Sequence, residues 1–203
     1  MVKNIIFDLG GVLIGWSPKY VYRQIFDTDK EVDWFLNNIC TLHWNEEQDG
    51  GRTIKEANQL LIKEHPEWEK QILTYYDRWE EMLSGPIYKS VEILQHLENY
   101  NKHRLYALTN WSAELFPIAR KKYDFLNIFR GILVSGEEHL KKPDPAIYNL
   151  IMDRYKLAAS ESLFIDDNLR NIEAADLLGM KVIHFINADQ LRKDLKNKFD
   201  IVV

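Results

Sequence analysis

Short apolar runs alternate with amphipathic stretches along most of the chain, and the period of each predicts its secondary structure. Residues 2–9 predict a buried strand, because Ile5, Ile6 and Phe7 form an apolar run that stops at Asp8, and Gly10-Gly11 then breaks the strand. Similar runs predict strands at residues 104–109, 131–135, 162–166 and 181–185. Helical periodicity predicts helices at residues 87–100, 113–122, 169–178 and 188–198, with another beginning at Asp144-Pro145. This alternation predicts an α/β fold built on a doubly wound parallel sheet.

A helical segment of about 70 residues interrupts the alternation after the first strand, and it is too long for an ordinary crossover. Ser17-Pro18 is typical of a helix start, and Thr53 to Glu56 has the pattern of a capping box. Residues 29–39 and 68–83 are also expected to be helical. We interpret the segment as a helical cap inserted over the sheet.

The expected domain boundaries follow from this insertion. Residues 1–15 and 85–203 form the core, and residues 16–84 form the cap. Gly15 and Ser84-Gly85 are candidate hinges because they lie where the chain passes between the two parts.

Composition excludes several classes of function. The 203 residues are 46% hydrophobic and carry a formal net charge of -5 with both signs interspersed, so nothing resembles the basic stripe of a nucleic-acid-binding protein. The single cysteine, Cys40, excludes an internal disulfide and a cysteine-rich zinc site. The sequence contains neither a signal-peptide pattern nor an apolar membrane span, so we expect a cytoplasmic protein without a membrane partner. The sequence does not indicate an oligomeric state.

Polar residues follow the predicted strands where the strands end. Asp8 ends the first strand, Thr109-Asn110 ends the second, and Asp166-Asp167 ends the fourth, while Lys142-Pro143 precedes a helix. Each alone is an ordinary turn or cap residue. Together they predict one site, because ligands bind outside the carboxyl ends of the strands in open parallel sheets.

The chemistry of these residues favours phosphoryl transfer. Carboxylates brought together repel one another, and a hard cation that accepts few carboxylates plus water, such as Mg²⁺, relieves the repulsion. Lys142 and Thr109 would neutralise charge on a phosphoryl group, which leaves Asp8 to attack phosphorus and form an aspartyl-phosphate.

The four segments resemble, in order, the four motifs of the haloacid dehalogenase (HAD) superfamily. The segments are Ile5 to Leu13, Leu105 to Asn110, Lys141 to Tyr148 and Leu163 to Asn168. The resemblance implies a Rossmann-like core with a helical cap that shapes substrate choice. It also implies roles for the site residues: Asp8 as nucleophile, Thr109 and Asn110 as phosphate ligands, Lys142 as the catalytic lysine, and Asp8, the Gly10 carbonyl, Asp166 and Asp167 as Mg²⁺ ligands.

One position departs from the family pattern. Most phosphatases of the superfamily carry a second Asp two residues after the nucleophile as general acid and base, and here that position is Gly10. His43 and Asp49 are candidate replacements from the cap, although we expect His43 to be a packing residue and Asp49 a turn residue. The Asp-Leu-Gly form resembles the branch of sugar phosphatases acting on α-glucose-1-phosphate, whose anomeric leaving group reduces the need for an acid. We therefore expect an Mg²⁺-dependent phosphomonoester hydrolase acting on a small phosphorylated metabolite, specifically a sugar phosphate.

Two alternatives stay open. A 2-haloacid dehalogenase releases halide without a proton, so Gly10 would do no harm, but Asp166-Asp167 would repel the substrate carboxylate. A non-catalytic binding protein with the same fold would also explain Gly10. A nicotinamide-binding protein is disfavoured because the glycines after the first strand do not form G-x-G-x-x-G.

The tryptophans are assigned to two groups. Trp34, Trp68 and Trp79 are expected in the core of the cap. Trp16, Trp44 and Trp111 are close enough to the motifs or the cap loop to be candidates for lining the site.

Overall fold

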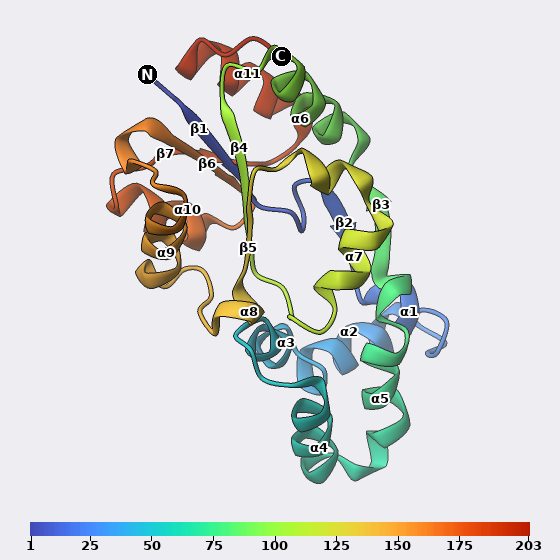
Figure 1. Cartoon of the computed structure of the whole chain (residues 1–203). Coiled ribbons are helices and arrows are strands. Elements are labelled where there is room, and N and C mark those ends of the chain that lie inside the picture. Colours follow the sequence, from blue (N-terminus) through green and yellow to red (C-terminus); the bar gives the residue numbers. More distant parts are fainter.

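The computed structural model describes all 203 residues and is organised around a five-stranded parallel sheet (Figure 1). In chain order its strands are β1 (Asn4–Phe7), β4 (Arg104–Thr109), β5 (Ile132–Val134), β6 (Ser162–Asp166) and β7 (Lys181–His184). Their order across the sheet is β5-β4-β1-β6-β7, so the first strand is central and the chain winds outward in both directions. Ile6 lies between Tyr106 of β4 and Phe164 of β6. The predicted α/β fold class is confirmed.

Helices cover both faces of the sheet, as the apolar run from Ile5 to Phe7 in β1 requires. Successive residues of a strand point to opposite faces. Ile5 and Phe7 belong to one apolar cluster with residues of α6 (Tyr88–Tyr100) and α11 (Ala188–Phe199). Ile6 belongs to a second cluster with residues of α9 (Pro145–Tyr155) and α10 (Leu169–Leu177). None of the helices is both long and apolar enough to span a membrane.

The predicted helical segment lies between two short antiparallel strands, β2 (Ile14–Trp16) and β3 (Leu83–Pro86). We call residues 17–82 the helical insert. Its helices are α1 (Lys19–Tyr22), α2 (Asp29–Asn38), α3 (Leu42–Asp49), α4 (Ile54–Glu64) and α5 (Glu69–Asp77), with 3₁₀ turns at Pro66–Trp68 and Trp79–Met82. Figure 1 shows the insert on the side where the sheet strands end, with α3 next to α8 (Ser135–Glu138).

The two-stranded ribbon brackets the segment that we predicted as the cap. Gly15 pairs with Gly85 in this ribbon, and Gly85 has a φ of 102°, which favours glycine. The domain boundaries and the hinge role of these residues stay predictions. The chain enters the insert through β2 and returns to the core through β3, next to the predicted boundaries.

Several local predictions differ from the structure. The helix predicted over 68–83 ends at Asp77, continues as a 3₁₀ turn and gives way to β3. Thr53 Oγ1 accepts the N–H of Glu56 at 3.2 Å, but the Glu56 side chain does not accept the Thr53 N–H, so the predicted capping box is only half formed. Glu114 Oε1 of the core accepts the next N–H, that of Ile54, at 2.7 Å. Helix α3 was not predicted. The remaining elements are α7 (Phe116–Lys122) and 3₁₀ turns at Asp124–Ile128 and Ala159–Glu161.

Candidate active site

Three neighbouring strands bring the predicted site residues together. Asp8 directly follows β1, Asp166 is the last residue of β6, and Thr109 is the last residue of β4. Because β1 lies between the other two, their carboxyl ends meet at one place. Lys142 reaches this place from the loop that precedes α9.

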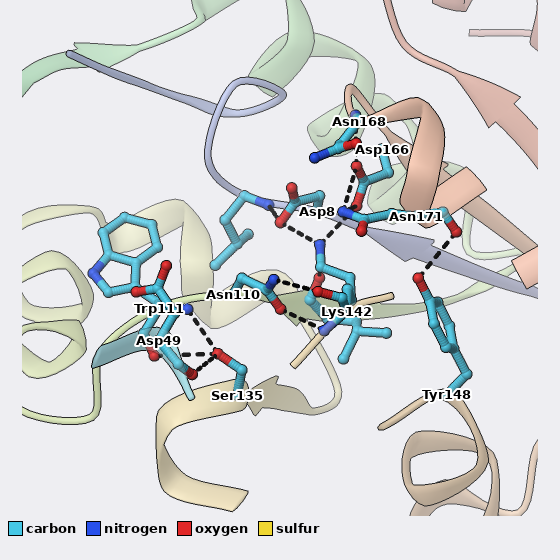
Figure 2. Close-up of polar contacts among 12 residues, drawn as sticks. Asp8, Asp49, Asn110, Trp111, Ser135, Lys142, Tyr148, Asp166, Asn168 and Asn171 are labelled. Atoms are coloured by element: carbon cyan, nitrogen blue, oxygen red, sulfur yellow. Dashed lines mark hydrogen bonds and ion pairs between the residues drawn. The ribbon is translucent and has the colours of Figure 1, made fainter. Parts of the chain in front are cut away.

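Lys142 is the centre of the site (Figure 2). Its side chain has 0% exposure, and its Nζ lies 3.0 Å from Asp8 Oδ1, 2.6 Å from Asp166 Oδ2 and 3.0 Å from the Leu108 carbonyl oxygen. Burial opposes a charged ammonium, but attraction to Asp166 and Asp8 outweighs it and raises the pKa of Lys142. The lysine is therefore a fixed positive charge beside the nucleophile.

For Asp8, the effect of burial on the pKa outweighs the attraction of Lys142. Burial raises the pKa of Asp8 to about 7, and the nearby Asp166 and Asp167 add to the rise, while Lys142 lowers it. The Leu9 N–H donates to Asp8 Oδ1 at 2.7 Å, so the same oxygen also receives a backbone hydrogen bond. A cation placed against Asp8 would relieve the repulsion that disfavours its ionised form.

The acidic residues fit a divalent cation. Asp8, Asp166 and Asp167 each offer one carboxylate oxygen, and these oxygens lie within 4.8 Å of one another. Asp166 is oriented by the Asn171 amide, at 3.1 Å to each oxygen, and by the Asn168 N–H at 2.8 Å. Oxygen ligands of this kind, with room for water, suit Mg²⁺.

The two residues of the second motif make different contacts from those expected. Asn110 forms two hydrogen bonds with the backbone of Lys142. Its Nδ2 donates to the Lys142 carbonyl at 2.9 Å, and its Oδ1 accepts the Lys142 N–H at 2.8 Å. These contacts position the lysine, so the phosphate-binding role of Asn110 stays a prediction. Thr109 is buried, does not line the cavity, and its hydroxyl has no hydrogen-bond partner. The phosphate-binding role of Thr109 therefore also stays a prediction.

A cavity of about 260 Å³ opens over these residues. The core contributes most of its polar wall: Asp8, Gly10, Gly11, Asn110, Ser112, Lys142, Asp167, Asn168 and Asn171. The helical insert contributes Leu42, Asn45, Glu46, Asp49 and Trp79. Trp16, Trp111 and Leu115 complete the lining.

The outcome for the tryptophans is mixed. Trp16 and Trp111 line the cavity, whereas Trp44 is buried in the insert with its ring edge-on to Tyr75, 5.2 Å between centroids. Trp79, which we expected only as packing, lines the cavity and packs edge-on against Trp111 at 5.6 Å. Trp34 is 49% exposed, so its assignment to the core of the insert is wrong.

The two candidate acids of the insert also differ. His43 is exposed and lies outside the cavity lining, so it is not the packed residue that we expected. Asp49 lines the cavity at the end of α3, and burial raises its pKa to about 7. Asp49 is therefore part of the site wall, and not only the turn residue that we expected.

Comparisons with known proteins agree with this geometry. A family model described as haloacid dehalogenase-like hydrolase matches residues 2–179. The chain is 29% identical to the drimenol cyclase drtB of Aspergillus calidoustus over 98% of this chain but only 37% of that protein. It is 26% identical to the sesquiterpene phosphatase astK of Aspergillus oryzae, covering 92% of this chain and 91% of the relative. It is 24% identical to a phosphorylated carbohydrates phosphatase of Thermotoga maritima, covering 92% and 88%.

Solved structures show the same fold. A HAD family enzyme of Bacteroides thetaiotaomicron in complex with magnesium and inorganic phosphate matches with a TM-score of 0.68 and 24% identity, covering 92% of this chain and 96% of that one. The family match over residues 2–179 bears out the resemblance of the four motifs. The chain belongs to the haloacid dehalogenase-like hydrolase family.

Proposed function

We propose that this chain is an Mg²⁺-dependent phosphomonoester hydrolase that forms an aspartyl-phosphate on Asp8. The observation that carries the proposal is the buried Lys142, whose Nζ contacts both Asp8 and Asp166 at the floor of an open cavity. A fixed cation beside a carboxylate nucleophile is what a phosphoryl group requires, because negative charge on its oxygens must be neutralised as the nucleophile approaches.

Each residue then has a role in the reaction. Asp8 attacks phosphorus, Lys142 neutralises a phosphoryl oxygen, and the unpaired hydroxyl of Thr109 donates to another. Asp8, the Gly10 carbonyl, Asp166 and Asp167 would hold Mg²⁺, which supplies further positive charge at the phosphoryl group. Asn110 keeps Lys142 in place through its two backbone hydrogen bonds.

A small phosphorylated metabolite, and specifically a sugar phosphate, is the proposed substrate. Asn45, Asn168 and Ser112 place amide and hydroxyl groups in the cavity wall, and such groups bind sugar hydroxyls. The likeness to a phosphorylated carbohydrates phosphatase supports this class. Residues 16–84 act as the cap over a core of residues 1–15 and 85–203, and the cap side of the cavity selects the substrate.

A monophosphate with an apolar organic group is the second candidate. Trp16, Leu42, Trp79, Trp111 and Leu115 form the apolar part of the cavity lining. An isoprenoid chain would bury its surface against such a wall. The likeness to a sesquiterpene phosphatase favours the same class.

The remaining alternatives make different demands on the site. A 2-haloacid would bring its carboxylate towards Asp166 and Asp167, which repel it. A non-catalytic protein would leave the ion-paired Lys142 and Asp8 without a reaction to support. Activity on haloacids and Mg²⁺ binding without turnover are the respective signs of these alternatives.

Phosphate release decides between these functions. The panel contains sugar phosphates, an isoprenyl monophosphate and 4-nitrophenyl phosphate, each with Mg²⁺, with EDTA and with the Asp8→Asn variant. We expect release that requires Mg²⁺ and that Asp8→Asn abolishes. Lack of release from every compound by the natural chain, or release that survives Asp8→Asn, would refute the proposal. Chloride release from a 2-chloroacid would instead establish the dehalogenase.

A further inference from the structure

The cavity wall contains two carboxyl groups that belong to the helical insert, Glu46 and Asp49. Glu46 is already paired, because Arg170 of the core lies 3.1 Å from its Oε1. Asp49 has no lysine or arginine nitrogen within ion-pair distance, although Lys141 and Lys142 form ion pairs with other carboxylates nearby. Asp49 is therefore the insert's one carboxyl group in the cavity without a cationic partner.

The core fixes the position of Asp49. Ser135 Oγ donates to the Asp49 carbonyl at 2.6 Å, and this hydroxyl oxygen of Ser135 also accepts the backbone N–H of Trp111 at 2.9 Å (Figure 2). Lys141 holds the preceding residues of α3, with its Nζ 3.1 Å from the Glu46 carbonyl and 2.8 Å from Glu47 Oε1. Helix α3 thus carries Asp49 to the cavity at a point that is tied to the second-motif loop.

The surroundings of Asp49 favour a carboxyl group that keeps its proton near neutral pH. Burial raises its pKa to about 7, and Glu46 adds to the rise, while Lys141, Lys142 and the Ser112 N–H lower it. Asp49 is also the last residue of α3, where the helix dipole disfavours negative charge. Tyr75 and Tyr76 of α5 lie close enough for the charge of Asp49 to act on them, and neither supplies a positive charge.

We propose that Asp49 is the general acid and base of this enzyme, supplied from the insert in place of the side chain that Gly10 lacks. The inference rests on the proposed phosphohydrolase function and adds a catalytic residue to it. With this acid, a site with Gly10 after the nucleophile would act on esters with poor leaving groups as well as good ones.

The proton balance is complete. When Asp8 Oδ bonds to phosphorus, the bond from phosphorus to the ester oxygen breaks, and that oxygen keeps the electron pair and takes the proton of Asp49. A water molecule then attacks phosphorus and gives a proton to the Asp49 carboxylate. The bond from Asp8 to phosphorus breaks, phosphate leaves, and both aspartates return to their starting states.

A series of substituted phenyl phosphates, from 4-nitrophenyl to 4-methoxyphenyl, tests the role of Asp49. Asp49→Asn keeps the shape of the side chain and removes the proton. We expect kcat/KM to fall about 10²-fold or more for 4-methoxyphenyl phosphate and to stay within about threefold for 4-nitrophenyl phosphate, whose leaving group needs no acid.

The pH profile tests the same role. The natural chain should lose activity on 4-methoxyphenyl phosphate as the pH rises above about 7, and Asp49→Asn should lack this decline. His43→Gln, on the exposed side of the same helix, is the matched control and should leave all values unchanged.

Rescue provides a second, independent result. A Cβ at Gly10 would meet no atom within 4 Å, and Gly10 lines the cavity, so Gly10→Asp introduces its carboxyl group without a backbone clash at Cβ. In the Asp49→Asn background it should restore at least part of the lost kcat/KM on 4-methoxyphenyl phosphate. Equal losses on both phosphates in Asp49→Asn, or no loss on either, would overturn the role of Asp49 and leave the phosphohydrolase standing. No turnover by the natural chain would overturn both.

Discussion

At the scale of single residues, burial has opposite consequences for Lys142 and Asp49. Lys142 is buried with two carboxylates in contact, and their attraction keeps it charged. Asp49 is partly buried without a cation in contact, so its pKa rises to about 7. Both results follow from the cost of placing a charge in a poorly solvated position, which only a partner of opposite charge offsets.

The raised pKa of Asp49 predicts a pH-dependent stability. The folded chain binds this proton more tightly than the unfolded chain, whose Asp has a pKa near 3.8. The stabilisation is therefore complete below that value and is lost as the pH rises to about 7. We expect Asp49→Asn to raise the melting temperature at pH 8 by about 2–4 °C for each ~1 kcal/mol recovered. At pH 4 it should bring no gain.

Thermal unfolding at constant Mg²⁺ concentration, followed by circular dichroism, measures this effect. His43→Gln is again the control, since His43 is exposed on the same helix. A gain of the same size at both pH values would mean that the asparagine stabilises by packing rather than by removing a charge.

At the scale of elements, the sequence correctly predicts the site residues that lie at the ends of strands. Asp8 and Asp166 follow from the ends of apolar strands, and parallel pairing then brings them together. Helix α3 lacks such a signal, because its buried residues are Trp44 and Gln48 while Leu42 is 60% exposed. Without an apolar stripe, neither the helix nor the direction of Asp49 could be derived from periodicity.

The turn after α3 decides where Asp49 lies, and Gly51 makes that turn possible. Gly51 has a φ of 100°, and a Cβ there would lie 2.2 Å from His139 Nδ1 of the core. We expect Gly51→Ala to destabilise the fold by about 1–3 kcal/mol from backbone strain and by a further ~1–3 kcal/mol from the collision. It should also lower kcat/KM, because the end of α3 or the His139 ring must shift to relieve the collision.

Gly179→Ala is the matched control for this prediction. Gly179 also has a positive φ, 80°, but a Cβ there would meet nothing within 4 Å, so it reports the strain alone. The double variant Gly51→Ala/His139→Ala should recover the part that the collision causes. Equal melting temperatures for the two single alanine variants would show that the contact with His139 has no energetic weight.

At the scale of the whole molecule, the insert and the core share one apolar interior. A single cluster of 44 buried residues contains Ile5 and Phe7 of the sheet together with Phe35 and Tyr75 of the insert. No layer of exposed surface divides this cluster, so we infer that the two parts unfold in one cooperative transition. A ligand that binds at the ends of the strands should then stabilise the insert as much as the core.

Magnesium provides the test of this coupling. A ligand that binds only the folded chain adds about 2.7 kcal/mol at a hundredfold excess over its Kd, which corresponds to a shift of about 5–10 °C at this chain length. We expect Mg²⁺ to raise the temperature of a single melting transition by this amount, as measured both by far-ultraviolet circular dichroism and by tryptophan fluorescence.

Fluorescence reports chiefly on the insert, because five of the six tryptophans lie in it or next to it: Trp16, Trp34, Trp44, Trp68 and Trp79. Asp167→Asn should abolish the shift because it removes one of the three clustered carboxylates. A shift seen by circular dichroism alone would mean that the insert unfolds independently of the core. No shift by either signal would contradict the proposed magnesium site.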